Sequence, residues 1–367
     1  MQYDFDTILD RRGRDALALE TISHAPVITD MFNREAPWEV EHISLAKQAD
    51  AFLIAPASAN FLGKAANGIA DDMLTTTILA TRAPVLVAPA MNSAMYLHPA
   101  VQENMRRLAQ RGYTFIQPES GHLACGEEGI GRLAEVDAIV DAAMKAMHPR
   151  RDLEGKRILV SAGPTQEAID PVRYITNHST GKMGYAIAKV CMQRGADVTL
   201  VTGPTSIEKP HFVNVVPITT AREMFEEVTG RAEEQDIIIK AAAVADYRPR
   251  YVSDEKVKKK DDDLALEMER TDDILAYLGA HKTKDQFLCG FSMETENMLE
   301  NSRKKLKKKN LDMIIANSLK MEGAGFGGNT NVVTVITEDF EKELGKLTKE
   351  ETADRILDQI LAQRGEV

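Results

Sequence analysis

From about residue 51 onward, short apolar runs that suit β-strands alternate with segments whose apolar residues recur at helical spacing. This alternation is typical of βαβ units, in which helices connect the parallel strands of one sheet. One series covers residues 51–147, a second restarts at Arg157, and the charged segment 148–156 lies between them. Because that segment combines charges with Pro and Gly, it favours a linker. We therefore predict an α/β protein with two tandem domains that divide near residue 150.

Both series predict where individual elements lie. In the first we expect strands at 51–55, 84–89 and 114–117 and helices at 71–82, 99–112 and 136–147. In the second we expect strands at 157–163, 197–203, 213–218, 236–244, 286–291, 311–317 and 331–337, and helices at 185–195, 221–228, 272–281, 299–310 and 349–364. Parallel sheets expose loops and helix N-termini at the carboxyl ends of their strands, so ligand sites are expected there.

Composition excludes several classes of protein. A length of 367 residues with 44% hydrophobic residues suits two packed cores and excludes a disordered chain. The net charge of −11 argues against bulk attraction to nucleic acid or an anionic membrane, and no apolar run approaches the ~20 residues of a membrane helix. The cysteines, Cys125, Cys191 and Cys289, lack the spacing of a disulfide framework or zinc cluster. We expect a cytoplasmic protein.

In the first domain, small and polar residues follow the predicted strands. Ser58 and Asn60 lie directly after the first strand, where backbone amides and short side chains can approach a phosphate or a flavin. An ordinary small-residue turn would look the same. His42 precedes a short helix and could exchange protons near neutral pH, although a lone histidine is more often a surface or capping residue.

The next two loops of this domain offer further candidates. Segment 89–99 follows a strand and carries Asn92, whose amide can bind a carboxylate, with Met95 and Tyr96 as apolar neighbours. A methionine more often fills space in a hydrophobic core than contacts a ligand. Segment 121–133 holds four glycines around Cys125, which suits a mobile flap that presents a thiol acid. A flexible surface loop with an incidental cysteine is the alternative.

In the second domain, segment 161–186 leads from a strand to a helix that begins near STGKMG. A Walker P-loop is disfavoured because Met183 follows Lys182 where Ser or Thr is required. Arg173 and Asn177 lie in this loop, where a guanidinium can hold an anion and an amide can hold a polarised carbonyl or acyl-phosphate.

Small residues and lysines mark the rest of this domain. Segment 241–249 lets a base or ribose approach the backbone and places Asp246 beside it. The lysine run that begins at Lys256 could fold over a triphosphate, or could be a solvated edge. Lys305 and Lys309 stand four residues apart on one helix and so share a face, which also fits an ordinary soluble helix.

Together these segments closely resemble the family of bifunctional phosphopantothenoylcysteine decarboxylase/phosphopantothenate–cysteine ligases of coenzyme A biosynthesis. The resemblance extends from about residue 21 to the end of the chain. It implies a flavodoxin-like flavoprotein domain at 21–150 and a Rossmann-like ligase domain at 151–367. The motifs that carry it are EVEHISLA, APASANFLGKAANGIADD, PAMNSAMY, GHLACGEEGIGRL, AGPTQEAIDPVRYITNHSTGKMG, AAAVADYRP, KVKKK and KKKNLDMIIAN.

For the second domain, the resemblance implies that CTP, with Mg²⁺, and 4'-phosphopantothenate form an acyl-cytidylate, from which cysteine displaces CMP. Asn177 would stabilise the acyl-cytidylate, and Arg173 would assist the cysteine step. No residue is assigned to Mg²⁺. Residues expected to hold CTP and the substrate are Ala242, Asp246, Lys256, Asp272, Asp273, Ile274, Leu275, Phe291, Lys305 and Lys309, those at 272–275 through their backbone. Asp272 stands where the family commonly has Pro.

For the first domain, the resemblance implies FMN-dependent decarboxylation of phosphopantothenoylcysteine. His42 would act as the base, Cys125 as the proton donor, and Asn92 with Met95 as substrate ligands. Ser58 and Asn60 would hold FMN. Tyr96 replaces the family's usual Trp. The family resemblance also implies a homo-oligomer, with a dimeric ligase domain and a larger assembly through the flavin domain.

The first 40 residues depart from the family, which begins with a strand, a glycine-rich turn and a helix around the flavin phosphate. That unit is not recognisable here, so residues 1–20 are treated as an atypical segment and the flavoprotein domain as incomplete at its start. Segment 3–13 instead resembles the opening of pyridoxal-phosphate C–S lyases. We therefore expect weakened or absent flavin binding and intact ligation. The alternatives are a ligase only, with the first domain as scaffold, and a non-catalytic regulatory flavoprotein.

Overall fold

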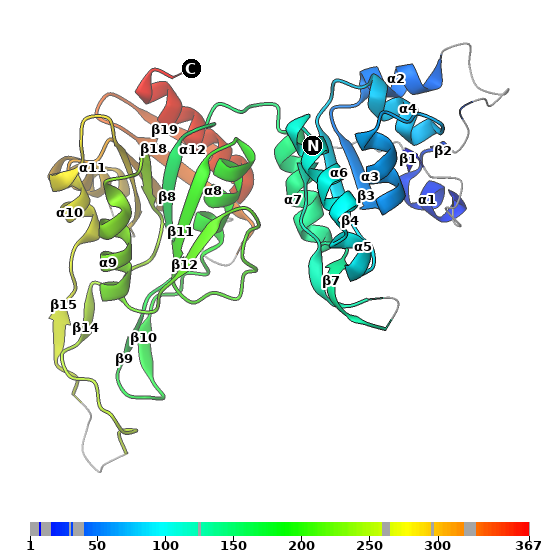
Figure 1. The fold of residues 1–367 in the computed structure, drawn as a ribbon. Helices are drawn as coiled ribbons and strands as arrows, with labels where there is room; N and C mark the ends of the chain where they lie inside the picture. The colour runs from blue at the N-terminus through cyan, green and yellow to red at the C-terminus, as the bar shows by residue number, and fades with distance from the viewer. Residues whose placement is uncertain are drawn as a thin grey trace. The chain divides into compact units, whose positions relative to one another are not determined.

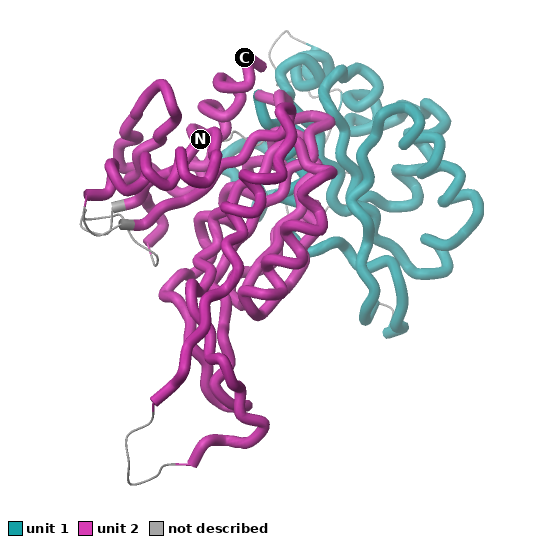
Figure 2. The backbone as a smooth tube through the Cα atoms, turned by 90° about the vertical axis from the view of Figure 1, so that its left-hand side faces the viewer, with its two compact units in different colours: residues 1–149 teal, residues 150–367 magenta. Residues whose placement is uncertain are grey.

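The structure, a computed structural model, describes residues 7–8, 16–28, 31, 40–123, 126–258, 265–294, 297–318 and 328–366. The chain divides into two compact units, 1–149 and 150–367, which Figures 1 and 2 distinguish. Each unit is a layered α/β structure, which confirms the predicted fold class. No helix among the described residues is long and apolar enough to cross a membrane.

Unit 1 is built on a parallel sheet in the order β3 (Phe52–Ala57), β4 (Val85–Pro89) and β5 (Thr114–Phe115). Side chains of β4 alternate between two cores, with Val87 facing one and Leu86 the other. Helices therefore cover both faces, as expected of a βαβ fold. They are α2 (Glu41–Gln48), α3 (Ala59–Ala66), α4 (Met73–Ala80), α5 (Ser93–Tyr96), α6 (Pro99–Gln110) and α7 (Val136–Met147).

The start of unit 1 corrects the sequence analysis. The chain forms β1 (Thr7–Ile8), α1 (Ala16–Ser23) and β2 (Val27–Ile28), and the two strands pair in parallel. A small strand–helix–strand unit is therefore present where none was expected, and α1 continues across residue 20. Strands of two residues are too short to produce an apolar alternation, which explains why the sequence pattern missed them.

Unit 2 contains an eight-stranded sheet whose first six strands are parallel and whose last two are antiparallel. The antiparallel edge was not predicted. The sheet order is β12 (Asn214–Pro217), β11 (Asp197–Thr202), β8 (Arg157–Ala162), β13 (Ile237–Lys240), β16 (Phe287–Glu294), β17 (Met313–Ser318), β18 (Thr330–Ile336) and β19 (Glu341–Thr348).

Helices cover both faces of this sheet. One core packs α8 (Lys182–Gln193) and α12 (Lys349–Arg364) against the sheet through residues such as Ile187 and Ile356. The opposite core contains Met224, Leu278 and Leu306. These residues come from α9 (Ala221–Ala232), α10 (Ile274–His281) and α11 (Met298–Lys308).

Within the described part of the chain, three antiparallel strand pairs lie outside the two main sheets. In unit 1, β6 (Glu119–His122) pairs with β7 (Glu128–Arg132). In unit 2 the pairs are β9 (Gln166–Ala168) with β10 (Tyr174–Thr176), and β14 (Tyr247–Pro249) with β15 (Met268–Arg270). Figure 1 shows the pairs of unit 2 extending away from the eight-stranded sheet. Their strands of three residues gave no signal in the sequence.

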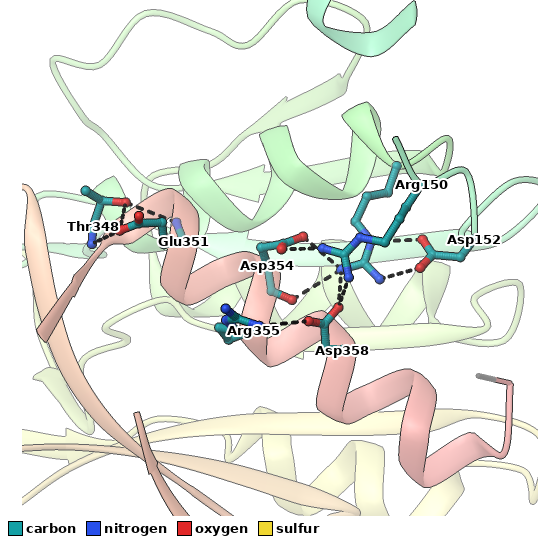
Figure 3. Close-up of polar contacts among 8 residues, drawn as sticks. Arg150, Asp152, Thr348, Glu351, Asp354, Arg355 and Asp358 are labelled. Atoms are coloured by element: carbon teal, nitrogen blue, oxygen red, sulfur yellow. Dashed lines mark hydrogen bonds and ion pairs between the residues drawn. The ribbon is translucent and has the colours of Figure 1, made fainter. Parts of the chain in front are cut away.

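A buried ion cluster joins the beginning and the end of unit 2. The side chain of Arg194, at the end of α8, is completely buried. Its guanidinium lies 2.6 Å from Asp152, 3.0 Å from Asp354 and 2.9 Å from Asp358. Arg150 also contacts the two aspartates of α12 (Figure 3). The cluster thus fastens the segment before β8 and the C-terminal helix to α8.

Candidate active sites

Unit 2 contains a cavity of about 450 Å³ at the carboxyl ends of its parallel strands. Its walls come from the loop that leads into α8, the end of β13, β16 and β17, and the start of α12, with lining residues at 177–184, 240–244, 246, 291–293, 317, 331 and 349. This is the edge at which parallel sheets bind ligands.

Four residues predicted from sequence meet in this cavity. Asn177, Ala242, Asp246 and Phe291 all line it, although they belong to three separate segments. The Asn177 amide donates a hydrogen bond of 3.0 Å to the carbonyl of Ala243, which holds the two loops together. These four residues, predicted from separate segments of the sequence, thus line one cavity.

A glycine allows this close approach. A Cβ atom on Gly184, in the first turn of α8, would lie 2.5 Å from the Cβ of Ala162 at the end of β8. No real side chain tolerates such a contact, so α8 packs directly on the strand only because residue 184 is glycine. The helix start is thereby pressed against the sheet edge and forms one wall of the cavity.

Several residues of the cavity wall were not predicted from the sequence. Asn317 is buried, and its side-chain oxygen has no hydrogen-bond partner among the described residues, so it is available to a donor on a ligand. Lys349 is also buried, and burial, followed by the charge of Lys182, lowers its pKa. Lys240 ends β13 and faces the same space. Asn317 ends the strand predicted at 311–317, which was the available signal for it, whereas Lys240 lies within the strand predicted at 236–244.

The expected nucleotide residues of α10 and α11 lie outside the cavity lining. Asp273 caps α10 by accepting a hydrogen bond of 3.0 Å from the amide of Ala276, and Lys309 lies 3.0 Å from the same carboxylate. Ile274 and Leu275 are buried, so only their backbone could reach a ligand. Asp272 and Lys305 are exposed.

Arg173 does not line the cavity either. Its guanidinium binds Asp170, which is buried and also accepts the backbone amides of Val172 and Val257. These contacts, led by Arg173, hold the pKa of Asp170 well below its ordinary value. Arg173 in turn donates to the carbonyl of Val257 at 2.8 Å, next to the exposed Lys256. Asp170 therefore anchors both Arg173 and the start of the lysine run.

We expect Asp170→Asn to lower kcat/KM about 10²-fold for the ligation that the sequence resemblance implies, because an amide nitrogen cannot accept the bonds from Arg173 and Val257, and small displacements of positioning groups have effects of this size. Steady-state kinetics of that reaction would measure the loss. Asp254→Asn, an exposed aspartate close to the same segment, is the matched control and should behave like the unmodified protein. Equal rates for both variants would contradict the anchoring role.

The second candidate site lies at the corresponding edge of unit 1. The loops after β3 and β4 are joined, since the amide of Ala90 donates to the carbonyl of Ala57 at 3.1 Å. Ser58 caps α3 by accepting from the Phe61 amide. The exposed amide of Asn60 has no hydrogen-bond partner among the described residues. Small side chains and a free amide thus border this edge.

The β6–β7 hairpin is fastened to the loop after β4. Asn92 donates to Glu127 at 2.9 Å, and Ser93 donates to the carbonyl of Ile130 at 2.7 Å. A Cβ on Gly131 would lie 2.1 Å from the carbonyl oxygen of Met91, so the hairpin touches the loop backbone directly. Cys125 lies outside the described residues; Leu123 and Gly126, the nearest described residues, lie between β6 and β7. Glu127 was not among the site residues predicted from the sequence.

Two predicted neighbours of this site behave differently. Met95 is exposed and available to a ligand, whereas Tyr96 is buried in the core and hydrogen-bonds Gln117 at 3.2 Å, so it is not a pocket wall. His42 lies on α2, which packs against α4. Figure 1 shows α2 at the opposite end of unit 1 from α5 and β7. The structure therefore does not bring His42 to the hairpin within one chain.

Comparison with known proteins covers both units. Residues 8–148 match the family model described as Flavoprotein, and residues 153–363 match that of the DNA/pantothenate metabolism flavoprotein C-terminal domain. The coenzyme A biosynthesis bifunctional protein CoaBC of Bacillus subtilis is 49% identical over 350 residues, which are 94% of this chain and 86% of that protein. This chain belongs to the CoaBC family. The resemblance seen in the sequence is thereby confirmed.

Other relatives of this CoaBC-family chain extend the comparison. A cysteine/cysteine sulfinic acid decarboxylase from an unknown prokaryote is 44% identical over 351 residues, 94% of this chain and 98% of that protein. The crystal structure of the C-terminal domain of a CoaBC protein superposes with a TM-score of 0.51 at 45% identity, and covers 59% of this chain and 100% of that chain. The Flavoprotein match begins at residue 8, within the segment that the sequence analysis set apart.

Proposed function

We propose that this CoaBC-family chain makes 4'-phosphopantetheine in two steps: CTP-dependent ligation of cysteine to 4'-phosphopantothenate, followed by FMN-dependent decarboxylation of the product. The convergence of Asn177, Ala242, Asp246 and Phe291 on one cavity carries the ligase half. Similarity over both units supports joining the two activities on one chain, and does not favour a ligase with an idle first domain. The relatives' metabolic role supports a cytoplasmic location.

In the ligation step, the carboxylate of 4'-phosphopantothenate attacks the α-phosphorus of CTP and releases pyrophosphate. The amine of cysteine then attacks the acyl carbonyl, and CMP leaves. Asn177 directs its amide into the cavity and stabilises the acyl-cytidylate, while Lys256, Lys305 and Lys309 balance the charge of the phosphates. Mg²⁺ accompanies the triphosphate as part of the substrate.

The residues at the edge of unit 1 fit FMN. The unpartnered amide of Asn60 and the hydroxyl of Ser58 suit its polar groups, and exposed Pro56 with Met95 suits a flat ring system. FMN, when bound, supplies the oxidation and reduction that make loss of CO₂ easy. Asn92 binds the departing carboxylate, His42 accepts a proton from the thiol, and Cys125 returns a proton to the product.

The separation of His42 from the hairpin supports an oligomer in which a second copy brings its α2 to the site. We expect co-expressed His42→Asn and Cys125→Ser chains to regain decarboxylation that neither has alone. Random mixing pairs an intact His42 with an intact Cys125 in about one site in four of a symmetric assembly. CO₂ release from phosphopantothenoylcysteine measures this. No recovery in hybrids of demonstrated mixed composition would contradict an intersubunit site.

Flavin binding tests the decarboxylase half directly. The visible absorption spectrum of the purified chain is recorded before FMN addition, and again after addition and desalting. The proposal predicts a retained flavin band. A colourless protein that still makes CMP and pyrophosphate from CTP, phosphopantothenate and cysteine would instead show a ligase with an impaired first domain.

Decarboxylation of free cysteine is a second candidate, favoured by the 44% identity to a cysteine/cysteine sulfinic acid decarboxylase. The two candidate substrates, phosphopantothenoylcysteine and free cysteine, are distinguished by measuring labelled CO₂ from carboxyl-labelled cysteine with and without CTP and phosphopantothenate. The main proposal expects labelled CO₂ only when CTP and phosphopantothenate are present. Release from cysteine alone at a comparable rate would favour the second candidate.

A further inference from the structure

A lysine that neither the motifs nor the family resemblance singled out faces the ligase cavity. Lys240 is the last residue of β13 and follows three buried isoleucines. Its side chain is half-buried, and its ammonium donates to the carbonyl of Ala242 at 3.1 Å. No carboxylate among the described residues lies within ion-pair distance of it. Its charge thus lines the cavity without a counter-ion.

The charged groups around Lys240 come from three elements. Asp246 belongs to the loop after β13, Asp273 begins α10, and Lys305 and Lys309 belong to the end of α11. Lys309 already pairs with Asp273 at 3.0 Å, so the Asp273 carboxylate acts on both Lys309 and Lys240. Three lysines therefore face two aspartates, and the group carries an excess of one positive charge when every lysine is protonated.

This setting disfavours the charged form of Lys240. Burial, and after it the charge of Lys309, lowers the pKa of Lys240 to about 8, with Lys305 acting in the same direction and the two aspartates opposing them. A group in such a position gains stability from an anion placed beside it. The expected nucleotide brings a triphosphate to this cavity and to the lysines of α11.

We propose that Lys240 is a further nucleotide-binding residue, whose ammonium group pairs with a phosphate of the bound CTP. This inference rests on the proposed ligase function and adds a third lysine to Lys305 and Lys309. A phosphate supplies the counter-ion that the described residues do not, and a charge-assisted bond of this kind is stronger than the present bond to a carbonyl.

Proton uptake on CTP binding follows from this contact. With a pKa of about 8, roughly half of the Lys240 side chains are neutral at pH 8 in the free protein. A neighbouring phosphate favours the protonated form and raises the pKa, so binding takes up about half a proton at pH 8 and less at pH 7. By linkage, CTP affinity falls as the pH rises through 8.

Isothermal titration calorimetry of the full-length chain tests this. CTP with Mg²⁺ is titrated at pH 8 in two buffers of different ionisation enthalpy, without phosphopantothenate, so that no reaction occurs. The unmodified protein should take up about half a proton. Lys240→Arg should bind CTP within a few-fold but take up almost none, because a guanidinium is always charged. Lys240→Met should lose about tenfold in affinity.

Lys307→Arg, on the exposed part of α11, is the matched control and should keep the uptake of the unmodified protein. Unchanged proton uptake in Lys240→Arg, with CTP still bound, would overturn this inference and leave the proposed function intact. A protein that does not bind CTP at all would overturn the proposed ligase function, and this inference with it.

Discussion

Replacing Arg194 with methionine is expected to lower the free energy of unfolding of unit 2 by about 3–5 kcal/mol. The guanidinium is fully buried and lies within 3.0 Å of three aspartates. Methionine preserves much of the side-chain length and apolar contact but removes the buried charge that Asp152, Asp354 and Asp358 surround, while Arg150 still contacts the two aspartates of α12. Removing one partner of a buried ionic cluster is costly because the remaining charges stay desolvated.

Urea unfolding of the full-length chain, followed by far-ultraviolet circular dichroism, measures this effect. Arg222→Met is the matched control, since Arg222 pairs with Glu226 on the surface of α9 and both side chains are largely exposed. Such a pair contributes less than about 1 kcal/mol. Equal midpoints for Arg194→Met and Arg222→Met would show that the buried cluster does not hold the two ends of unit 2 together.

Replacing Asn177 with aspartate is expected to slow amide formation about 10²–10³-fold. The asparagine is held by its bond to the Ala243 carbonyl and lines the cavity. Aspartate has the same shape but cannot donate that bond, and it adds a negative charge beside Asp246 where the anionic acyl-cytidylate forms. The loss of a donor that acts on the reacting group should appear in the rate of the chemical step.

Single-turnover formation of phosphopantothenoylcysteine measures the Asn177 effect. Asn214→Asp makes the same chemical change on β12, where the amide only contacts Thr199, and should leave the rate unchanged. CTP affinity, measured separately, should change much less than the rate. A normal rate for Asn177→Asp would remove Asn177 from the catalytic step.

Helices and strands could be predicted from the sequence where the local preference of a segment agrees with the structure that it adopts in the folded unit. The helices predicted at 136–147 and 349–364 are observed with those bounds. The second begins with a capping box between Thr348 and Glu351, a signal that is readable in sequence. The pairs β9–β10 and β14–β15 were missed because three residues are too few to show periodicity. Their formation depends on tertiary contacts instead.

Some residues of the candidate sites could likewise be predicted from the sequence, and others could not. Asn177 and Asp246 could be predicted because each lies in the connection that follows a strand of the open α/β sheet, β8 for Asn177 and β13 for Asp246. Lys240 and Asn317 complete the cavity only through the order of strands in the sheet, which the sequence does not reveal. The family resemblance implies that His42 and Cys125 act on the same substrate, but the fold places α2 at the other end of the unit from β7. The partners of Arg194 are up to 164 residues away, beyond any local pattern.

The central claim is that one chain performs both reactions. The most direct test incubates the purified, FMN-supplemented chain with CTP, Mg²⁺, phosphopantothenate and carboxyl-labelled cysteine, and counts CMP, pyrophosphate and labelled CO₂. The account predicts equal amounts of all three, with 4'-phosphopantetheine as the final product. CMP and pyrophosphate without labelled CO₂, and with phosphopantothenoylcysteine accumulating, would contradict it.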